Sequence, residues 1–332
     1  MNSVPRIASW AVALVVALPA GLEIGSPATA SPPEAGASAA QGGSSGPAGS
    51  TPAGGAAGAI TAAPPSPAPP TDPPELAALR AAFLSADPDE LARAGARLAA
   101  RRLAGPLSGG DRELALAAAA AAPSAPDAVW LLEPLGQLAG SADRPIAAAA
   151  SRAAARIAGA VDLDALLVGD VPLDWVRARA AEYRSRAADP GRWVDVRVAS
   201  LEVAAHLVRA LGERATPADS PYDLAAVLAD PEPELRRAGV ELAPTPLSPD
   251  ALRLIATRAG SDDDPAVAAA AVLAVCEGLA FGDPAGPVMA ALGSRGLARA
   301  RALASFGDLP DGARDAAARC VTAGGDRASE AK

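Results

Sequence analysis

The chain has 332 residues, a formal net charge of −9 and 50% hydrophobic residues, more than half of which are alanine. Its single histidine excludes metal sites built from several imidazoles, and its two cysteines exclude a disulfide scaffold or a four-thiolate zinc site. The acidic balance argues against a dedicated nucleic-acid binder, which carries a basic surplus. We therefore expect no metal, no cofactor and no nucleic-acid partner.

Residues 1–30 have the pattern of a secretory signal peptide. Arg6 precedes an uncharged apolar run over 7–18, and Ala28-Thr29-Ala30 supplies the small residues that precede a cleavage site. Twelve apolar residues are too few to cross a hydrocarbon core of about 30 Å as a helix. We expect cleavage after Ala30 and export to the periplasm, cell envelope or exterior, with no transmembrane segment in the mature chain. A retained N-terminal segment is the alternative.

Residues 31–71 are rich in proline, glycine and alanine, with Ile60 as the one large aliphatic residue and Glu34 as the one charge. Such a segment cannot bury enough apolar area to offset its ordering entropy, which predicts a disordered linker. It is either a functional spacer or a tail without a role. The string Gly42-Gly43-Ser44-Ser45-Gly46 matches a hydrolase nucleophile elbow, but it lacks the flanking strand and helix, so we assign it no catalysis.

From residue 72 onward the chain carries repeated helix starts, in which an acceptor side chain is followed directly by proline. The acceptor caps an orphan backbone N–H, and proline suits the first helical position because it needs no partner there. These starts begin at Asp72, Asp87, Ser220, Asp230, Ser248, Asp264 and Asp283.

Apolar residues at helical spacing follow these starts, and no segment shows sustained strand-type alternation. The pattern predicts helix pairs at 73–103, 220–243, 248–280 and 285–306 and a closing helix at 311–323. Between them it predicts helices at 111–122, 126–139, 145–159, 162–169, 172–187 and 192–212. Repeated helix pairs are typical of an α-solenoid, in which each unit buries its apolar face against the next. We therefore expect an all-α repeat domain over 72–323 and a disordered tail over 324–332.

The segment 230–240 resembles the second helix of a HEAT-like repeat: an acidic turn, an aliphatic residue followed by arginine (Leu235-Arg236), and then small residues. Weaker copies lie at 195–199 and 264–268, and still weaker ones at 143–146 and 87–91. The resemblance implies stacked helical hairpins with long surfaces for partners. A tetratricopeptide array has a similar period but ranks second, because its signature is missing around Trp130.

Several arginines are candidate binding residues. Those spaced by four on predicted helices, or placed where HEAT-like repeats carry arginine, are Arg93, Arg97, Arg152, Arg156, Arg197 and Arg236. A row of guanidinium groups grips carboxylates or phosphates. The alternative, which we favour, is that the arginines pair with aspartates of adjacent turns and order the stack.

The segment from 175 to 193 departs from the repeat pattern and combines arginine with aromatic residues: Trp175, Arg179, Tyr183, Arg186 and Trp193. This composition is typical of interface hot spots. It equally suits a wedge between irregular helices. We take the segment as the best single prediction of a contact surface.

The remaining reactive residues have structural interpretations. His206 lies on a mostly apolar helix without a neighbouring nucleophile, which favours packing over catalysis. Cys276 and Cys320 either pair after export or, as we expect, stay buried as free thiols on separate helices two units apart. Asp262, Asp263 and Asp264 lack the spacing of a calcium loop and are better explained by a helix cap.

The sequence thus predicts an exported, non-catalytic scaffold for protein–protein interaction. One alternative, implied by the family resemblance, is an enzyme of the HEAT-like lyase type or an accessory protein to an enzyme. Another is a purely structural component of the envelope.

Overall fold

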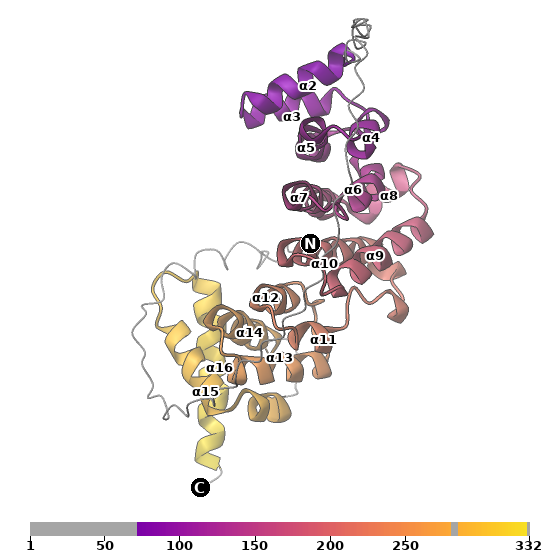
Figure 1. Ribbon diagram of the computed structural model, residues 1–332. Helices are drawn as coiled ribbons and strands as arrows, with labels where there is room; N and C mark the ends of the chain where they lie inside the picture. The colour runs from indigo at the N-terminus through magenta and orange to yellow at the C-terminus, as the bar shows by residue number, and fades with distance from the viewer. Residues whose placement is uncertain (1–71, 280–284, 331–332) are drawn as a thin grey trace, which may run out of the picture. The chain divides into compact units, whose positions relative to one another are not determined.

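The computed structural model describes residues 72–279 and 285–330, and every regular element in these ranges is a helix (Figure 1). The predicted signal peptide, the predicted linker and the helix start at Asp283 lie outside the described residues and remain predictions.

Successive helices pair into hairpins, each with a short connection. The pairs are α2 (Pro74–Leu84) with α3 (Pro88–Ala96), α4 (Ala100–Ser108) with α5 (Arg112–Ala121), α6 (Leu132–Leu138) with α7 (Arg144–Ala160), α9 (Leu173–Ala188) with α10 (Val194–Leu211), α11 (Leu224–Leu228) with α12 (Pro233–Glu241), α13 (Pro249–Ser261) with α14 (Pro265–Gly278), and α15 (Ala285–Ala304) with α16 (Asp311–Glu330). Between α7 and α9 lies the short α8 (Leu163–Val168), and the 3₁₀ helix η3 (Ala128–Leu131) leads into α6.

The hairpins stack so that their second helices form a continuous row. In this second row α5, α7, α10, α12 and α14 follow one another, each packed on the next, and α14 also contacts α16 (Figure 1). The first helices form the other row, in which α4 contacts α6, α6 contacts α9, and α11 contacts α13. The predicted all-α solenoid of stacked hairpins is confirmed.

Alanine and glycine set the spacing between the layers. Alanines such as Ala117, Ala150 and Ala204 are fully buried in the second row. A Cβ at Gly95 of α3 would lie 2.5 Å from the carbonyl oxygen of Ala121 at the end of α5. The helices therefore approach so closely that leucine and alanine, with few aromatic residues, fill the interior.

Three of the predicted helix caps are confirmed: Asp87, Ser248 and Asp264 each accept backbone N–H groups of the first turn. Three others are wrong, the first of them at Asp72, because Pro73 occupies the N-cap of α2. The helix after Asp230 starts at Pro233, because the second proline of Pro231-Glu232-Pro233 takes the first helical position. The helix after Ser220 is capped by Asp223 instead.

Three element boundaries also differ from the prediction. The region 73–103 contains α2, α3 and the start of α4, which begins after Ala99 without a side-chain cap and so leaves no signal in the sequence. Asp72 binds Arg80, and Pro73 occupies the N-cap of α2. Helix α16 continues to Glu330, past the predicted end at 323, where no proline interrupts it.

The two cysteines form a disulfide, which corrects our expectation of free thiols. Cys276 of α14 and Cys320 of α16 are both buried, with their Cα atoms 5.2 Å apart. The prediction failed because it placed these helices two units apart. In the structure they belong to consecutive hairpins and pack directly on one another. None of the helices in the described ranges is long and apolar enough to cross a membrane.

Candidate interaction surface

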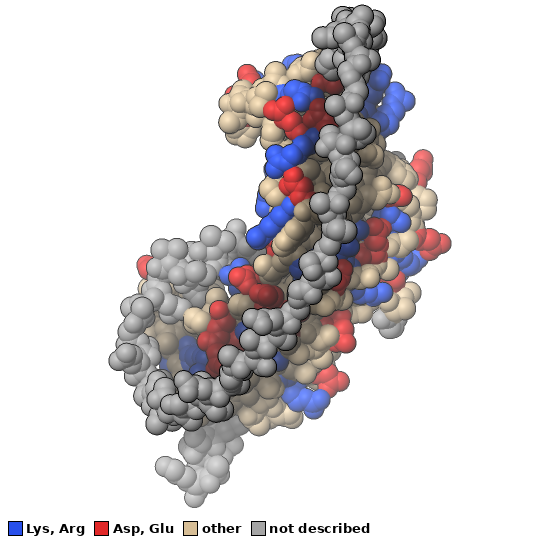
Figure 2. Space-filling model, viewed as in Figure 1, with Lys and Arg blue, Asp and Glu red and all other residues tan. Residues whose placement is uncertain are grey.

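An Asp–Arg ladder runs along the N-terminal edge of the second row and includes two of the candidate arginines, Arg197 and Arg236. Each rung joins an arginine of one hairpin to an aspartate that begins the second helix of the next hairpin or lies just before one. The rungs are Arg80–Asp111 at 2.6 Å, Arg112–Asp143 at 2.6 Å, Arg144–Asp195 at 3.7 Å, Arg197–Asp230 at 2.5 Å and Arg236–Asp262 at 2.8 Å. In Figure 2 acidic and basic side chains lie beside one another at the level of α5 and α7.

Most of these aspartates serve two partners at once. Asp111 and Asp143 cap α5 and α7 through backbone N–H groups while they accept an arginine from the preceding unit. These arginine hydrogen bonds hold the pKa of both carboxyl groups below the ordinary value. Burial by itself raises the pKa of Asp262, but the hydrogen bonds from Arg236 and from the Asp264 backbone outweigh it, and the net shift is downward.

The rungs become more buried toward the C-terminus. The Arg112 side chain is 59% exposed, whereas that of Arg197 is 5% exposed and that of Asp262 is 1% exposed. The ladder ends there, and Arg299 of α15 instead donates to the carbonyl oxygens of Ala259 and Asp262 at the end of α13. Arg197 and Arg236 are thus engaged in the structural pairing that we favoured.

The other candidate arginines are differently placed. Arg93 of α3, Arg97 at its C-cap, and Arg152 and Arg156 of α7 are all exposed, and in the described part of the chain they form no ion pair. Arg93 donates to the backbone carbonyl of Asp89 at 3.1 Å. The structure does not bring these two pairs of arginines together with the segment from 175 to 193.

An aromatic pair lies on the first row, where η3 meets α9. The rings of Trp130 and Trp175 have centroids 5.2 Å apart and are tilted by 55°. Trp130 is 41% exposed, which makes it one of the few large apolar side chains open to solvent in the described ranges. The guanidinium of Arg179 lies 5.8 Å from the centre of the Trp175 ring. A cation over an indole face is a favourable contact and orients both groups.

Glu182 connects this aromatic pair to a second stacked cation. Its carboxylate accepts from Arg179 and from Arg186, both at 2.8 Å. Arg186 lies 4.8 Å from the ring centre of Tyr183, which is fully buried and donates its hydroxyl to the carbonyl of Leu132 at 2.8 Å. Burial raises the pKa of Tyr183 well above its ordinary value, so the phenol stays protonated.

We call the side chains of Trp130, Glu133, Trp175, Arg179 and Glu182 the tryptophan–arginine surface. Beside it, a groove of about 550 Å³ is lined by Glu182, Ser185, Arg186, Ala188, Asp189 and Arg192. Within the described residues, Nε of Arg179 and Nη1 of Arg186 have no acceptor. Arg179 is thus held by Glu182, by Glu133 at 3.7 Å and by the Trp175 ring. Arg186 is held by Glu182 and the Tyr183 ring, and each guanidinium buries one N–H without a hydrogen-bond partner.

The sequence prediction named two of the five residues of this surface, Trp175 and Arg179. Trp175, Arg179 and Arg186 lie on one side of α9, while Tyr183 points into the interior. Trp193 lies at the N-cap of α10, and the ring that contacts Trp175 belongs to Trp130 instead. Trp130 and Glu133 were missed as site residues because they lie over 40 residues upstream, Trp130 in η3 and Glu133 in the first turn of α6. Nothing local in the sequence shows that this segment packs against α9.

The remaining candidates have structural surroundings. His206 of α10 lies with Nδ1 3.1 Å from Nη1 of Arg209. Asp264 caps α14, as the cap interpretation expected, whereas Asp262 is buried and closes the last rung of the ladder. In the described residues, no three histidine, cysteine or acidic side chains gather closely enough to hold a metal ion.

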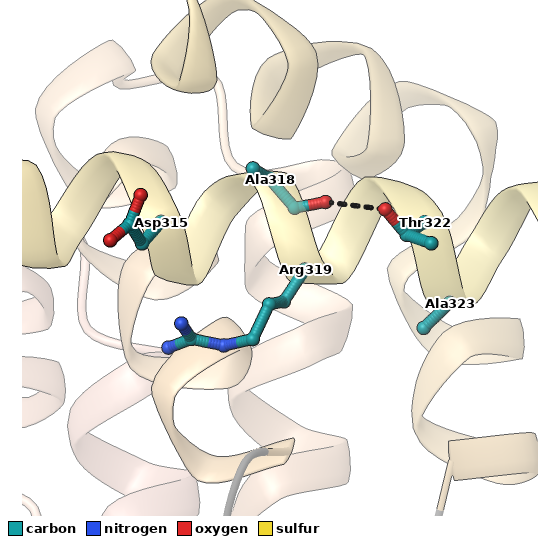
Figure 3. A pocket seen from close by; sticks show the side chains of 5 residues that line it. All are labelled: Asp315, Ala318, Arg319, Thr322 and Ala323. Atoms are coloured by element: carbon teal, nitrogen blue, oxygen red, sulfur yellow. Dashed lines mark hydrogen bonds between the residues drawn. The ribbon is translucent and has the colours of Figure 1, made fainter.

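A further depression lies on the last helix. It measures about 540 Å³, and its five lining residues, Asp315, Ala318, Arg319, Thr322 and Ala323, all belong to α16 (Figure 3). The Thr322 hydroxyl donates to the carbonyl of Ala318 at 3.1 Å. A depression lined by one helix lacks a facing wall, so it offers little to enclose a ligand.

Comparison with known proteins gives only remote structural likenesses. No family model and no curated protein matches the sequence. The chain is similar to the crystal structure of an engineered protein from a structural genomics consortium, with 17% identity over 76% of this chain and 97% of that one and a TM-score of 0.39. It is also similar to a designed armadillo repeat protein, with 18% identity, coverage of 75% and 92%, and a TM-score of 0.32. Scores this low carry no argument about the surface, and the solenoid assignment rests on the stacked hairpins themselves.

Proposed function

We propose that this protein is an exported, non-catalytic scaffold of degenerate HEAT-like repeats that binds a protein partner through its tryptophan–arginine surface. The observation that carries the proposal is the solvent-exposed Trp130, held against Trp175 with Arg179 over the second ring. Tryptophan and arginine dominate the energetics of protein interfaces, and pre-ordered side chains lose little entropy on binding.

The Asp–Arg ladder supports kinship with HEAT-like repeats. The arginines of the two best sequence matches, Arg197 and Arg236, fill equivalent rungs between consecutive hairpins. An irregular unit length, with the extra helix α8 between α7 and α9, accounts for the weakness of the pattern in the sequence.

Two observations support export and the absence of catalysis. The disulfide between Cys276 and Cys320 suits an oxidising compartment, where such bonds persist, and it agrees with the signal-like pattern of residues 1–30. The disulfide also removes both thiols from nucleophilic chemistry. Nη1 of Arg209 lies 3.1 Å from Nδ1 of the single histidine.

Site-specific photo-crosslinking in cells that produce the full chain tests the proposal. A benzophenone amino acid replaces Trp130 in one sample and Leu254 in the other. Leu254 of α13 is a matched control, because the two side chains are 41% and 39% exposed. We expect a discrete cross-linked protein from position 130 that is absent from position 254.

The cross-linked protein is then purified and its affinity measured by calorimetry. We expect Trp130→Ala and Arg179→Ala each to weaken binding about tenfold, and Leu254→Ala to leave it unchanged. Identical products from both positions, or equal affinity for wild type and Trp130→Ala, would remove the tryptophan–arginine surface from the proposal. Amino-terminal sequencing of the exported chain tests localisation separately, with Ser31 expected as the first residue.

A further inference from the structure

At the tryptophan–arginine surface, the charged groups nearest to solvent are carboxylates. The side chains of Arg179 and the adjoining Arg186 are 20% and 9% exposed, whereas those of Glu133 and Glu182 are 47% and 32% exposed. Both guanidinium groups are already engaged by carboxylates and rings of the fold. A partner at this surface therefore meets an indole and carboxylates before it meets a guanidinium.

Trp130 stands in line with two of the exposed carboxylates. Its backbone N–H donates to the carbonyl of Asp127 at 3.1 Å, which closes a 3₁₀ turn, and Glu133 follows three residues later in the first turn of α6. Residues three apart lie on the same side of such turns. Asp127 is exposed, and within the described residues its carboxylate caps no backbone N–H and forms no ion pair. The indole thus has an exposed acid on each side of it along the chain.

No cation in the described ranges neutralises this line from outside. The exposed arginines of α4, the helix that packs on η3, are Arg101 and Arg102, and among the described residues neither forms an ion pair or a ring contact. The contact between Glu133 and Arg179, at 3.7 Å, is longer than the 2.8 Å contact between Glu182 and Arg179. Glu133 therefore keeps the capacity to accept a hydrogen bond from a further donor.

The fold itself shows which group suits an indole beside a carboxylate. Arg179 lies 5.8 Å from the centre of the Trp175 ring, with Glu182 at 2.8 Å and Glu133 at 3.7 Å from its guanidinium. The ring face and the carboxylates attract the same positive charge, so the two contacts reinforce each other. Trp130 offers this combination a second time, now toward solvent.

We propose that the protein partner contacts Trp130 with a lysine or arginine side chain from a basic segment. Its cation stacks on the indole and pairs with Glu133 and Asp127, while its aliphatic stem covers the exposed part of the ring. The inference rests on the proposed function, because it names the chemistry of the partner at the same surface. The exposed carboxylates repel acidic segments, which gives the surface a preference for positive charge.

Fluorine NMR of the full chain labelled with 5-fluorotryptophan tests the proposal without the natural partner. The resonance of Trp130 is assigned by its loss in Trp130→Phe. The probe is a capped peptide in which glycine alternates with arginine, and the control peptide has glutamine in place of every arginine. We expect the arginine peptide to shift the Trp130 resonance in a saturable way and the glutamine peptide to bind at least about tenfold more weakly.

Two matched double variants separate this site from the overall acidity of the chain. Asp127→Asn with Glu133→Gln removes both acids beside Trp130. Asp164→Asn with Asp170→Asn removes two exposed carboxylates of α8 and the turn after it, which form no ion pair among the described residues. We expect the first pair of changes to weaken binding of the arginine peptide about tenfold and the second by less than about twofold. Circular dichroism verifies that both double variants are folded.

Equal shifts with the two peptides, or equal losses of affinity in the two double variants, would overturn the proposal. A discrete cross-link from Trp130 to a protein whose contacting peptide carries no lysine or arginine would also overturn it, while the proposed function would stand. A failure of the proposed function is seen separately, as identical cross-linked products from the positions of Trp130 and Leu254.

Discussion

The Asp–Arg ladder and the tryptophan–arginine surface use the same cation in opposite ways. In the ladder, Arg197 and Arg236 each meet an aspartate that lies near the start of the next unit's second helix, and both pairs are largely removed from solvent. On the surface, Arg179 and Arg186 share one glutamate and lie over aromatic rings, with an N–H left over on each. Arginine stabilises the stack where an aspartate lies at a helix start. Where aromatic rings orient it instead, two arginines share one carboxylate on the first row of helices.

The largest expected effect comes from the most buried rung. Arg236→Ala leaves the Asp262 carboxylate, 1% exposed, without its cation, and we expect a loss of about 2–4 kcal/mol of unfolding free energy by urea denaturation at pH 7. The folded-state pKa of Asp262 lies below its ordinary value, so the contribution is present above that value and is lost as pH falls through the folded-state pKa. The difference between variant and wild type should shrink in acid, and a difference that is constant down to pH 3 would contradict the charge pairing.

Trp130→Ala should separate stability from binding. Trp130 is partly exposed and packs on one ring, so its removal should cost about 1 kcal/mol of stability, a shift in Tm of about 2–4 °C. The same change should weaken partner binding about tenfold. A large fall in Tm with unchanged affinity would assign Trp130 to the core of the fold, and differential scanning calorimetry distinguishes the two outcomes.

An exposed ion pair of the ladder should contribute little to the stability of the fold. The Arg112 side chain is 59% exposed, so water screens its contact with Asp143, and Arg112→Ala should change the free energy of unfolding by less than about 1 kcal/mol. Comparing this loss with that of Arg236→Ala by urea denaturation then measures how the stabilisation from each ion pair of the ladder depends on its burial. Equal losses at both rungs would show that position in the stack, rather than burial, sets the energy.

The smallest expected effect is an increase in stability. Burial, and then the nearby charge of Glu241, raise the pKa of Glu202 on α10, so folding favours its protonated form. That contribution is complete below the unfolded-state pKa and is lost as pH rises through the folded-state pKa. Glu202→Gln should therefore raise Tm at pH 7 by about 1–2 °C and leave it unchanged near pH 3. A variant that melts below wild type at pH 7 would show that the carboxylate has a stabilising partner.

Local signals in the sequence predicted most helices, because caps and periodicity act within a few residues. The segment predicted at 192–212 is α10, Val194–Leu211, and the cap at Asp264 opens α14. The same signals identified Arg197 and Arg236 as partners for neighbouring aspartates. Helix α4 was missed because Ala99 offers no side-chain cap.

Features made by contact between distant segments could not be found in this way. Trp130 meets Trp175 through the stacking of α6 against α9, and Cys276 meets Cys320 because α16 folds back onto α14. Each depends on which helices become neighbours, and that is set by the length of the intervening elements. Helix periodicity carries no information about it.

The disulfide also gives the stack a direction of disassembly. A linear array loses its terminal units first, since each of them is held from one side only. Because α16 is covalently attached to α14, the final helix cannot peel away alone, and its fraying requires the preceding hairpin to open with it. Unravelling therefore starts at α2, where no covalent bond holds the first hairpin, and amides of α2 and α3 should exchange with deuterium before those of α14.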